Sequence, residues 1–135
     1  MTGSQPPAGS AAGIVQCVVL DCPDPGELAA FYAGILGGAV NKPDPRWAAG
    51  PDFATLHTAA GLVLAFQRVT GYLPPRWPEA ASPQHCHLDI EVPDLDAAQA
   101  QVTAAGGTLL CADPRGWRVF ADVAGHPFCL LPGHS

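Results

Sequence analysis

The sequence feature that most constrains the fold is an internal repeat. The segment CVVLDCPDPGELAAFYAGILGG, which starts at Cys17, aligns with HLDIEVPDLDAAQAQVTAAGG, which starts at His87. The pair Pro-Asp that ends at Asp24 returns in the second copy at Asp94. A doubled pattern of this length indicates a fold built from two copies of one supersecondary unit. The sequence therefore predicts two tandem modules.

Each copy begins with a strand that leads directly into a helix. Apolar residues alternate before Asp24, as expected for a strand with one buried face. Asp24 is a good N-cap, Pro25 suits the first helical position, and Glu27 completes an Asp-x-x-Glu capping box. Gly37 is expected to end the helix. The residues expected to pack together in the first copy are Val18, Leu20 and Cys22 of the strand and Leu28, Phe31, Tyr32, Ile35 and Leu36 of the helix.

The second copy repeats this order, with alternating strand residues before Asp94 and a helix that ends near Gly106. Short apolar runs rather than further helices follow both helices, and these predict strands. We expect three strands after each helix, although only two runs are located in the first half. The runs are residues 53–58, 62–69, 108–111, 117–123 and 128–131. The predicted class is α+β, with two tandem βαβββ modules.

The expected domain organisation is one domain over residues 14–132, a length that suffices for a single core. Module one covers residues 14–70 and module two covers residues 85–132. Between them, residues 71–84 contain four prolines, which disfavour regular structure and predict a linker. Residues 1–13 are expected to form a flexible N-terminal tail.

Composition excludes several classes of partner. The formal net charge of −6 disfavours binding to nucleic acid. Apolar stretches such as residues 62–66 are far shorter than the roughly 20 residues that span a bilayer. The five cysteines include no CxxC pair, which is typical of reduced thiols and predicts a cytoplasmic protein.

Two motifs carry a resemblance to the vicinal-oxygen-chelate superfamily, which includes glyoxalase-like and bleomycin-resistance-like proteins. The first is Asp24, Phe31, Tyr32, Leu36 and Gly37, and the second is Asp122, Gly125, Phe128 and Leu130. The resemblance covers roughly residues 14–132. It implies that the two modules form a cupped, mostly antiparallel sheet, with a ligand or a metal ion inside the cup. Relatives often form homodimers, which we also expect here.

The alternation of side chains along the strands predicts which residues face the cup. If the even-numbered residues of the first strand pack on the helix, the odd-numbered ones face the ligand. We expect a small-molecule ligand to contact Cys17, Val19, Ala65, Gln67, His87, Asp89 and Cys129.

The metal-binding pattern of the superfamily is incomplete in this chain. Metal-dependent relatives typically place His or Gln on the first strand, Glu on the fourth, His on the fifth and Glu on the eighth. The matching positions are Cys17, Ala65 or Gln67, His87 and Cys129. Only His87 fits the pattern, and hard divalent ions favour the missing carboxylates. We therefore expect no bound metal or other cofactor. The alternative is zinc held by Cys17, His87, Cys129 and Gln67.

The resulting prediction is a glyoxalase-like small-molecule-binding protein with a degenerate metal site rather than an enzyme. One alternative is a metal-dependent lyase, isomerase or dioxygenase-type enzyme with a Cys/His site, and another is an antibiotic-sequestering resistance protein. His87 is the candidate catalytic residue, as a proton acceptor beside Asp89 or Glu91. Trp47, Trp77 and Trp117 are further candidates for a wall on which a flat ligand stacks.

Overall fold

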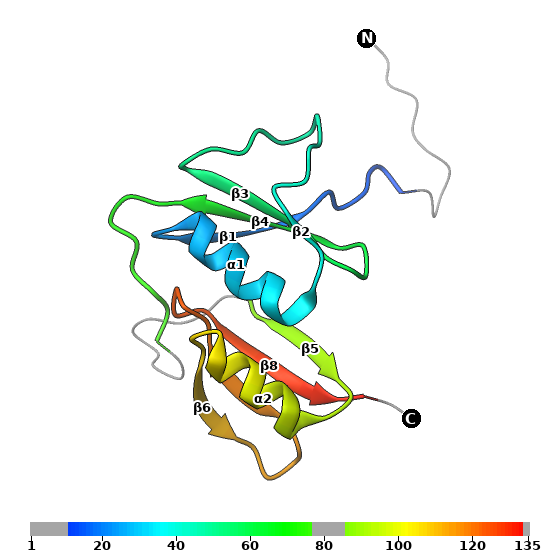
Figure 1. Ribbon diagram of the computed structural model, residues 1–135, viewed down its shortest axis with the longest axis vertical. Coiled ribbons are helices and arrows are strands. Elements are labelled where there is room, and N and C mark those ends of the chain that lie inside the picture. The colour runs from blue at the N-terminus through cyan, green and yellow to red at the C-terminus, as the bar shows by residue number, and fades with distance from the viewer. Residues whose placement is uncertain (1–10, 77–85, 134–135) are drawn as a thin grey trace.

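The computed structural model describes residues 11–76 and 86–133, and within them it has the predicted doubled βαβββ order. The two modules lie one after the other along the long axis of the molecule (Figure 1). Module one contains β1 (Val18–Cys22), α1 (Pro25–Leu36), β2 (Ala39–Val40), β3 (Phe53–His57) and β4 (Val63–Arg68). Module two contains β5 (Leu88–Val92), α2 (Leu95–Ala104), β6 (Thr108–Ala112), β7 (Arg118–Ala121) and β8 (Pro127–Pro132). The strand β2, which the sequence did not locate, completes the first module.

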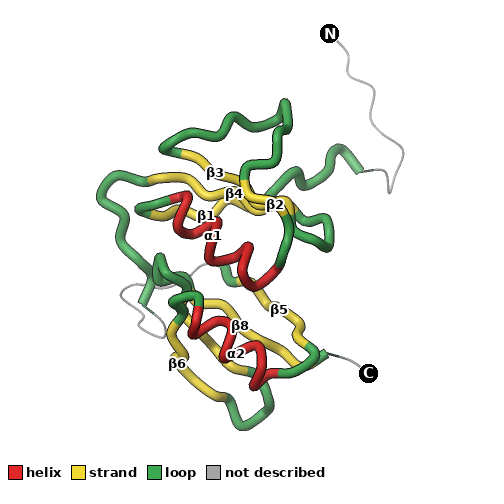
Figure 2. Tube along the Cα trace, viewed as in Figure 1, coloured by secondary structure: helices red, strands yellow, loops and turns green. Residues whose placement is uncertain are grey.

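Each module forms one mixed four-stranded sheet. The strand orders are β1-β4-β3-β2 and β5-β8-β7-β6. The first strand of each module runs parallel to the last, and the other neighbouring pairs are antiparallel. The helices α1 and α2 lie on the same side of the molecule (Figure 2). The prediction of a mostly antiparallel α+β fold is therefore confirmed.

Both helices begin at the predicted caps. The carboxylate of Asp24 accepts a hydrogen bond from the backbone N–H of Glu27 at 3.2 Å, and that of Asp94 accepts one from Ala97 at 3.1 Å. Helix α1 ends where the chain takes up positive φ angles at Gly37 (68°) and at the residue after it. These angles strain residues that carry a Cβ, so the glycines fix the end of the helix.

A single hydrophobic core joins the two modules. The ring of Phe31 on α1 lies edge-on to Phe128 of β8, with ring centroids 6.0 Å apart, while Tyr32 stacks on Phe66 of β4 at 6.1 Å. Helix α1 therefore packs on both sheets. The hydroxyl of Tyr32 also donates a buried hydrogen bond of 2.6 Å to Asp122 in the turn before β8. Asp122 in turn accepts backbone hydrogen bonds from Ala124 and His126.

Three parts of the chain differ from the expectation or fall outside the structure. Leu62 begins the apolar run 62–69 that predicted a buried strand, but it precedes β4 and is 50% exposed. Residues 1–10 of the expected tail and residues 77–85, which include Trp77, lie outside the described residues. Within the described part, neither helix is long and apolar enough to cross a membrane.

Candidate functional site

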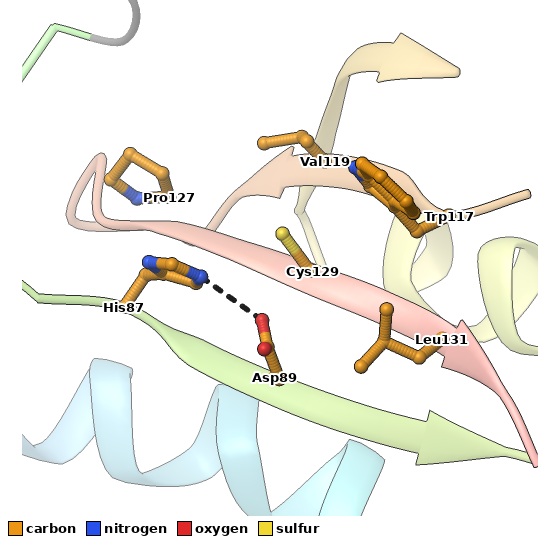
Figure 3. A pocket seen from close by; sticks show the side chains of 7 residues that line it. All are labelled: His87, Asp89, Trp117, Val119, Pro127, Cys129 and Leu131. Atoms are coloured by element: carbon orange, nitrogen blue, oxygen red, sulfur yellow. Dashed lines mark ion pairs between the residues drawn. The ribbon is translucent and has the colours of Figure 1, made fainter. Parts of the chain in front are cut away.

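A hollow of about 370 Å³ opens on the face of the β5–β8 sheet that is turned away from helix α2. We call this hollow the module-two pocket. Side chains on β8 alternate, so Phe128 and Leu130 are fully buried in the core while Cys129 faces the pocket. The pocket is lined by His87, Asp89, Trp117, Val119, Pro127, Cys129 and Leu131 (Figure 3).

The polar floor of the module-two pocket is a cluster of three side chains. The Nε2 atom of His87 lies 3.0 Å from Oδ1 of Asp89. The possible ligand atoms of His87, Asp89 and Cys129 all lie within 4.8 Å of one another. Cys129 lies on β8, Asp89 lies on β5, and His87 immediately precedes β5. The three side chains are neighbours because β5 and β8 pair in parallel. His87 and Asp89 thus meet Cys129, and all three are sequence-predicted binding residues.

The thiol of Cys129 is held in its neutral form. Burial raises the pKa of Cys129, and the charge of Asp89 and a hydrogen bond to that carboxylate raise it further. A thiol with a raised pKa is a weak nucleophile at neutral pH, because the thiolate is the reactive form. Covalent catalysis by Cys129 is therefore not favoured by this arrangement.

Trp117 forms an aromatic wall of the pocket, and a turn before it sets its position. The backbone N–H of Arg115 donates to Asp113 at 2.8 Å, and the guanidinium of Arg115 lies 4.3 Å from the centroid of the Trp117 ring. An arginine over an aromatic face is a favourable cation–π contact. Trp117 was one of several stacking candidates in the sequence, and the structure places it at the pocket.

The same turn occurs in module one, where its tryptophan has a different role. The N–H of Arg46 donates to Asp44 at 2.9 Å, and its guanidinium lies 4.3 Å from the Trp47 ring. Trp47 lies edge-on to His57 of β3, and Asp44 contacts Nε2 of the same histidine at 3.2 Å. The recurring letters Asp-Pro-Arg, at residues 44–46 and 113–115, were the sequence signal for this second repeat.

The loop that carries Trp47 covers part of the corresponding face of module one. Ala65 is completely buried, and its ladder partner Thr55 is 3% exposed. The Nδ1 atom of His57 is also buried and has no hydrogen-bond partner among the described residues. The hydrogen bonds from Arg46 lower the pKa of Asp44 well below its usual range. Ala65, predicted to contact ligand, is therefore inaccessible from this face.

A second hollow of about 670 Å³ lies between the modules. We call it the inter-module pocket. His126 closes one side, where it contacts the hydroxyl of Tyr72 at 3.1 Å and the backbone oxygen of Asp21. His87 and Pro127 line this pocket as well as the module-two pocket, so the two hollows share a boundary. The other lining residues are Val18, Val19, Leu20, Asp21, Tyr32, Leu73, Pro74, Pro75, Cys86, Leu88 and His126.

The seven sequence-predicted binding residues are thus divided between three places. His87, Asp89 and Cys129 meet in the module-two pocket, and Val19 lines the inter-module pocket. Cys17 lies just before β1 in module one and is not among the described residues that line either pocket. Gln67 is an exposed residue of β4 whose ladder partners are Asp21 and Phe53, and Ala65 is buried.

The donor set of the module-two pocket suits some metal ions better than others. Hard ions such as Mg²⁺ or Mn²⁺ favour several oxygen ligands, and Asp89 is the single carboxylate in the cluster. One imidazole, one thiolate and one carboxylate match the ligand types of a zinc site with an open fourth position. The cluster therefore fits zinc, with Asp89 beside His87 and Cys129 in place of the predicted Cys17 and Gln67.

Comparisons with solved structures show the fold. A glyoxalase/bleomycin resistance protein/dioxygenase domain from Frankia sp. EAN1pec is 21% identical, with a TM-score of 0.64, and covers 93% of this chain and 100% of that one. The fosfomycin resistance protein FosX from Listeria monocytogenes, complexed with Mn(II) and sulfate ion, is 17% identical, with a TM-score of 0.65 and 93% of each chain covered. A glyoxalase/bleomycin resistance protein/dioxygenase family enzyme from Burkholderia phytofirmans PsJN is 19% identical, with a TM-score of 0.64. The alignment covers 87% of this chain and 96% of that one.

The family follows from the sequence itself. A comparison with curated proteins gave no match. Residues 17–131, which include both modules, match the sequence model of the glyoxalase-like domain family. The doubled βαβββ fold and the similar structures agree with this assignment. The chain therefore belongs to the glyoxalase-like domain family, within the vicinal-oxygen-chelate superfamily.

Proposed function

We propose that this protein binds a small organic molecule in the module-two pocket. The observation that carries the proposal is a polar cluster of His87, Asp89 and Cys129 at the floor of a hollow with apolar walls. Ligand sites in proteins commonly combine mostly apolar walls with a few convergent polar groups. The pocket volume of about 370 Å³ falls within the range of such sites.

The chemistry of the cluster supports binding more than turnover. The raised pKa of Cys129 leaves no activated thiolate nucleophile. Asp89 contacts both neighbours, so it can orient His87 and hold the thiol as a hydrogen-bond donor. We propose that these groups fix the orientation of a ligand that the apolar walls retain.

A blocked pocket tests the proposal. Leu131→Arg places a large charged side chain at the pocket wall, whereas Leu109→Arg changes an exposed residue on β6. A set of small molecules is screened by thermal shift against wild-type protein and both variants. We expect the compounds that stabilise wild type to lose their effect in Leu131→Arg and to keep it in Leu109→Arg. Equal stabilisation of all three proteins would place the binding site elsewhere.

A zinc-dependent lyase or isomerase is the second candidate, and the 4.8 Å grouping of His87, Asp89 and Cys129 favours it. Bound zinc would supply Lewis-acid polarisation of a substrate carbonyl or an activated water. Elemental analysis of tag-free protein distinguishes the two candidates. Near-stoichiometric zinc that is lost in Cys129→Ala would favour the enzyme, and metal-free protein that still binds small molecules would favour the first proposal.

The proposal does not extend to the ligands named for one structural neighbour. A FosX structure from Listeria monocytogenes contains Mn(II) and a dihydroxypropylphosphonic acid. Among the described residues that line the module-two pocket there is no lysine or arginine to pair with a phosphonate. Sequestration of another antibiotic is consistent with the pocket, and no particular residue favours it.

We further propose that the protein is a cytoplasmic homodimer. In the described sheets, four strands (β1, β2, β5 and β6) pair on one side only, and these edges are available for pairing or exchange with a second copy. Light scattering coupled to size-exclusion chromatography tests the dimer, and a monomer at micromolar concentration would contradict it.

A further inference from the structure

We propose that the ligand of the module-two pocket is an organic amine, with its ammonium group beside Asp89 and its apolar part against Trp117. This inference rests on the proposed function and adds the chemical class of the ligand. Three features of the described residues carry it: the charges that line the pocket, the hydrogen-bonding capacity of Asp89 and the aromatic wall.

The described residues that line the module-two pocket include one acid and no basic side chain other than His87. None of the six lysines and arginines is among the described residues that line either hollow. Arg115 is bound to Asp113, and Arg118 points to the helix side, where it contacts Asp96 on α2 at 2.8 Å. The inter-module pocket likewise contains a carboxylate, that of Asp21. A ligand that carried a carboxylate or phosphate would meet no lysine or arginine among the described lining residues.

Asp89 has both the exposure and the capacity to accept a further donor. Its side chain is 54% exposed, and it faces the hollow beside Cys129 (Figure 3). A carboxylate has about four lone-pair sites, of which the contacts with His87 and Cys129 use two. An ammonium group with three N–H donors matches this acceptor.

The remaining lining residues suit the apolar part of such a molecule. Trp117, Val119 and Leu131 present aromatic and aliphatic surface around the carboxylate. Pro127 and His87 continue into the inter-module pocket, whose walls are largely apolar. A ligand with one amine and an apolar part can therefore pair with Asp89 and pack against the apolar lining residues at the same time.

Three probes of the same shape and different charge test the inference. They are 3-phenylpropylamine, 3-phenylpropan-1-ol and 3-phenylpropanoate, measured by isothermal titration calorimetry at neutral pH. We expect the amine to bind about tenfold more tightly than the alcohol, as a charge-assisted hydrogen bond implies. We expect the carboxylate to bind most weakly.

Paired variants assign the effect to Asp89. Asp89→Asn keeps the shape and removes the charge, and it should lower amine affinity about tenfold while it leaves the alcohol unchanged. Glu91→Gln is the matched control, because Glu91 lies on the same face of β5 but outside the pocket lining. This variant should bind all three probes as wild type does.

The outcomes separate the two proposals. Equal affinity for the three probes, or a preference for the carboxylate, would overturn the amine inference and leave small-molecule binding intact. A loss of amine affinity in Glu91→Gln equal to that in Asp89→Asn would also overturn it, because the effect would then be general surface charge. Failure of all three probes to bind at millimolar concentration would overturn the amine inference, whereas the proposed function would be contradicted only if the screen with Leu131→Arg also found no pocket-dependent binding.

Discussion

The hydroxyl of Tyr32 on α1 donates a 2.6 Å hydrogen bond to the carboxylate of Asp122, 90 residues further along the chain. Tyr32 is 1% exposed and Asp122 is 5% exposed. Burial raises the pKa of the Tyr32 hydroxyl well above its usual range, and the charge of Asp122 adds to the effect. The first module is thus bound to the second by a buried polar contact as well as by the shared core.

Removal of the Tyr32 hydroxyl should destabilise the whole domain. Tyr32→Phe leaves an oxygen of buried Asp122 without its donor, and we expect the free energy of unfolding to fall by about 1–3 kcal/mol. Urea denaturation measures this change. Tyr72→Phe is the control, because Tyr72 donates to the backbone oxygen of Ala124 and is only partly buried. A larger loss in the control would contradict this interpretation.

Alanine substitutions at two glycines of module one should change the stability of the fold in opposite directions. A Cβ at Gly38, where φ is 105°, would lie 2.0 Å from the backbone oxygen of His57. Gly34 is inside helix α1, and a Cβ there meets nothing within 4 Å. We expect Gly38→Ala to prevent folding or lower the melting temperature strongly, and Gly34→Ala to stabilise by up to about 1 kcal/mol. Circular dichroism melts compare the two, and equal effects would show that backbone strain at Gly38 is unimportant.

Asp89 should control the reactivity of Cys129. Because the Asp89 charge and hydrogen bond raise the pKa of Cys129, Asp89→Asn should lower that pKa and increase the thiolate fraction at any given pH. We expect faster alkylation of Cys129 by iodoacetamide, with the pH–rate profile shifted to lower pH. Peptide mass spectrometry distinguishes Cys129 from the other cysteines. Glu91→Gln is the control, and an unchanged rate at Cys129 in Asp89→Asn would refute the coupling.

Cys22 should be the least reactive of the described cysteines. Its side chain is fully buried, and burial raises its pKa to about 11. We therefore expect no modification of Cys22 in the native protein during an exposure that modifies exposed Cys86 completely. In urea both thiols should react at similar rates. Early labelling of Cys22 in native protein would mean that β1 opens readily.

The turn before Trp117 should contribute to stability in a pH-dependent way. Hydrogen bonds from Arg115 lower the pKa of Asp113 from its ordinary value of 3.8. A group with a depressed folded-state pKa stabilises the fold above its unfolded pKa, and this contribution is lost as the pH falls through the folded pKa. The difference in melting temperature between wild type and Asp113→Asn should therefore be constant near neutral pH and shrink below about pH 4. A difference that grows in acid would contradict the assignment.

The sequence predicted the strand faces well, because the alternation of side chains follows directly from strand geometry. His87, Asp89 and Cys129 share one face, as the doubled pattern indicated, and the parallel pairing of β5 with β8 brings them together. The N-caps at Asp24 and Asp94 were likewise predictable from the sequence, because capping depends on residues close in sequence.

Features that depend on loops could not be predicted. The position of Cys17 relative to His87 depends on how the modules pack, and Ala65 is buried beneath a face that the loop after β2 partly covers. The two-residue strand β2 is too short to produce a periodic signal. Trp117 was one candidate among several, because its direction is set by a turn whose hydrogen bonds appear only in three dimensions.

The Asp-Pro-Arg turn, which occurs once in each module, has different consequences in the two copies. In the first module, the Trp47 ring packs against His57 of the same module. In the second, the extra residue Gly116 precedes the tryptophan, and Trp117 borders open space. Substitution of Trp47 should therefore lower the stability of the fold, whereas substitution of Trp117 should change which ligands bind. Tolerance to mutation would then differ sharply between two halves that share one repeated sequence pattern.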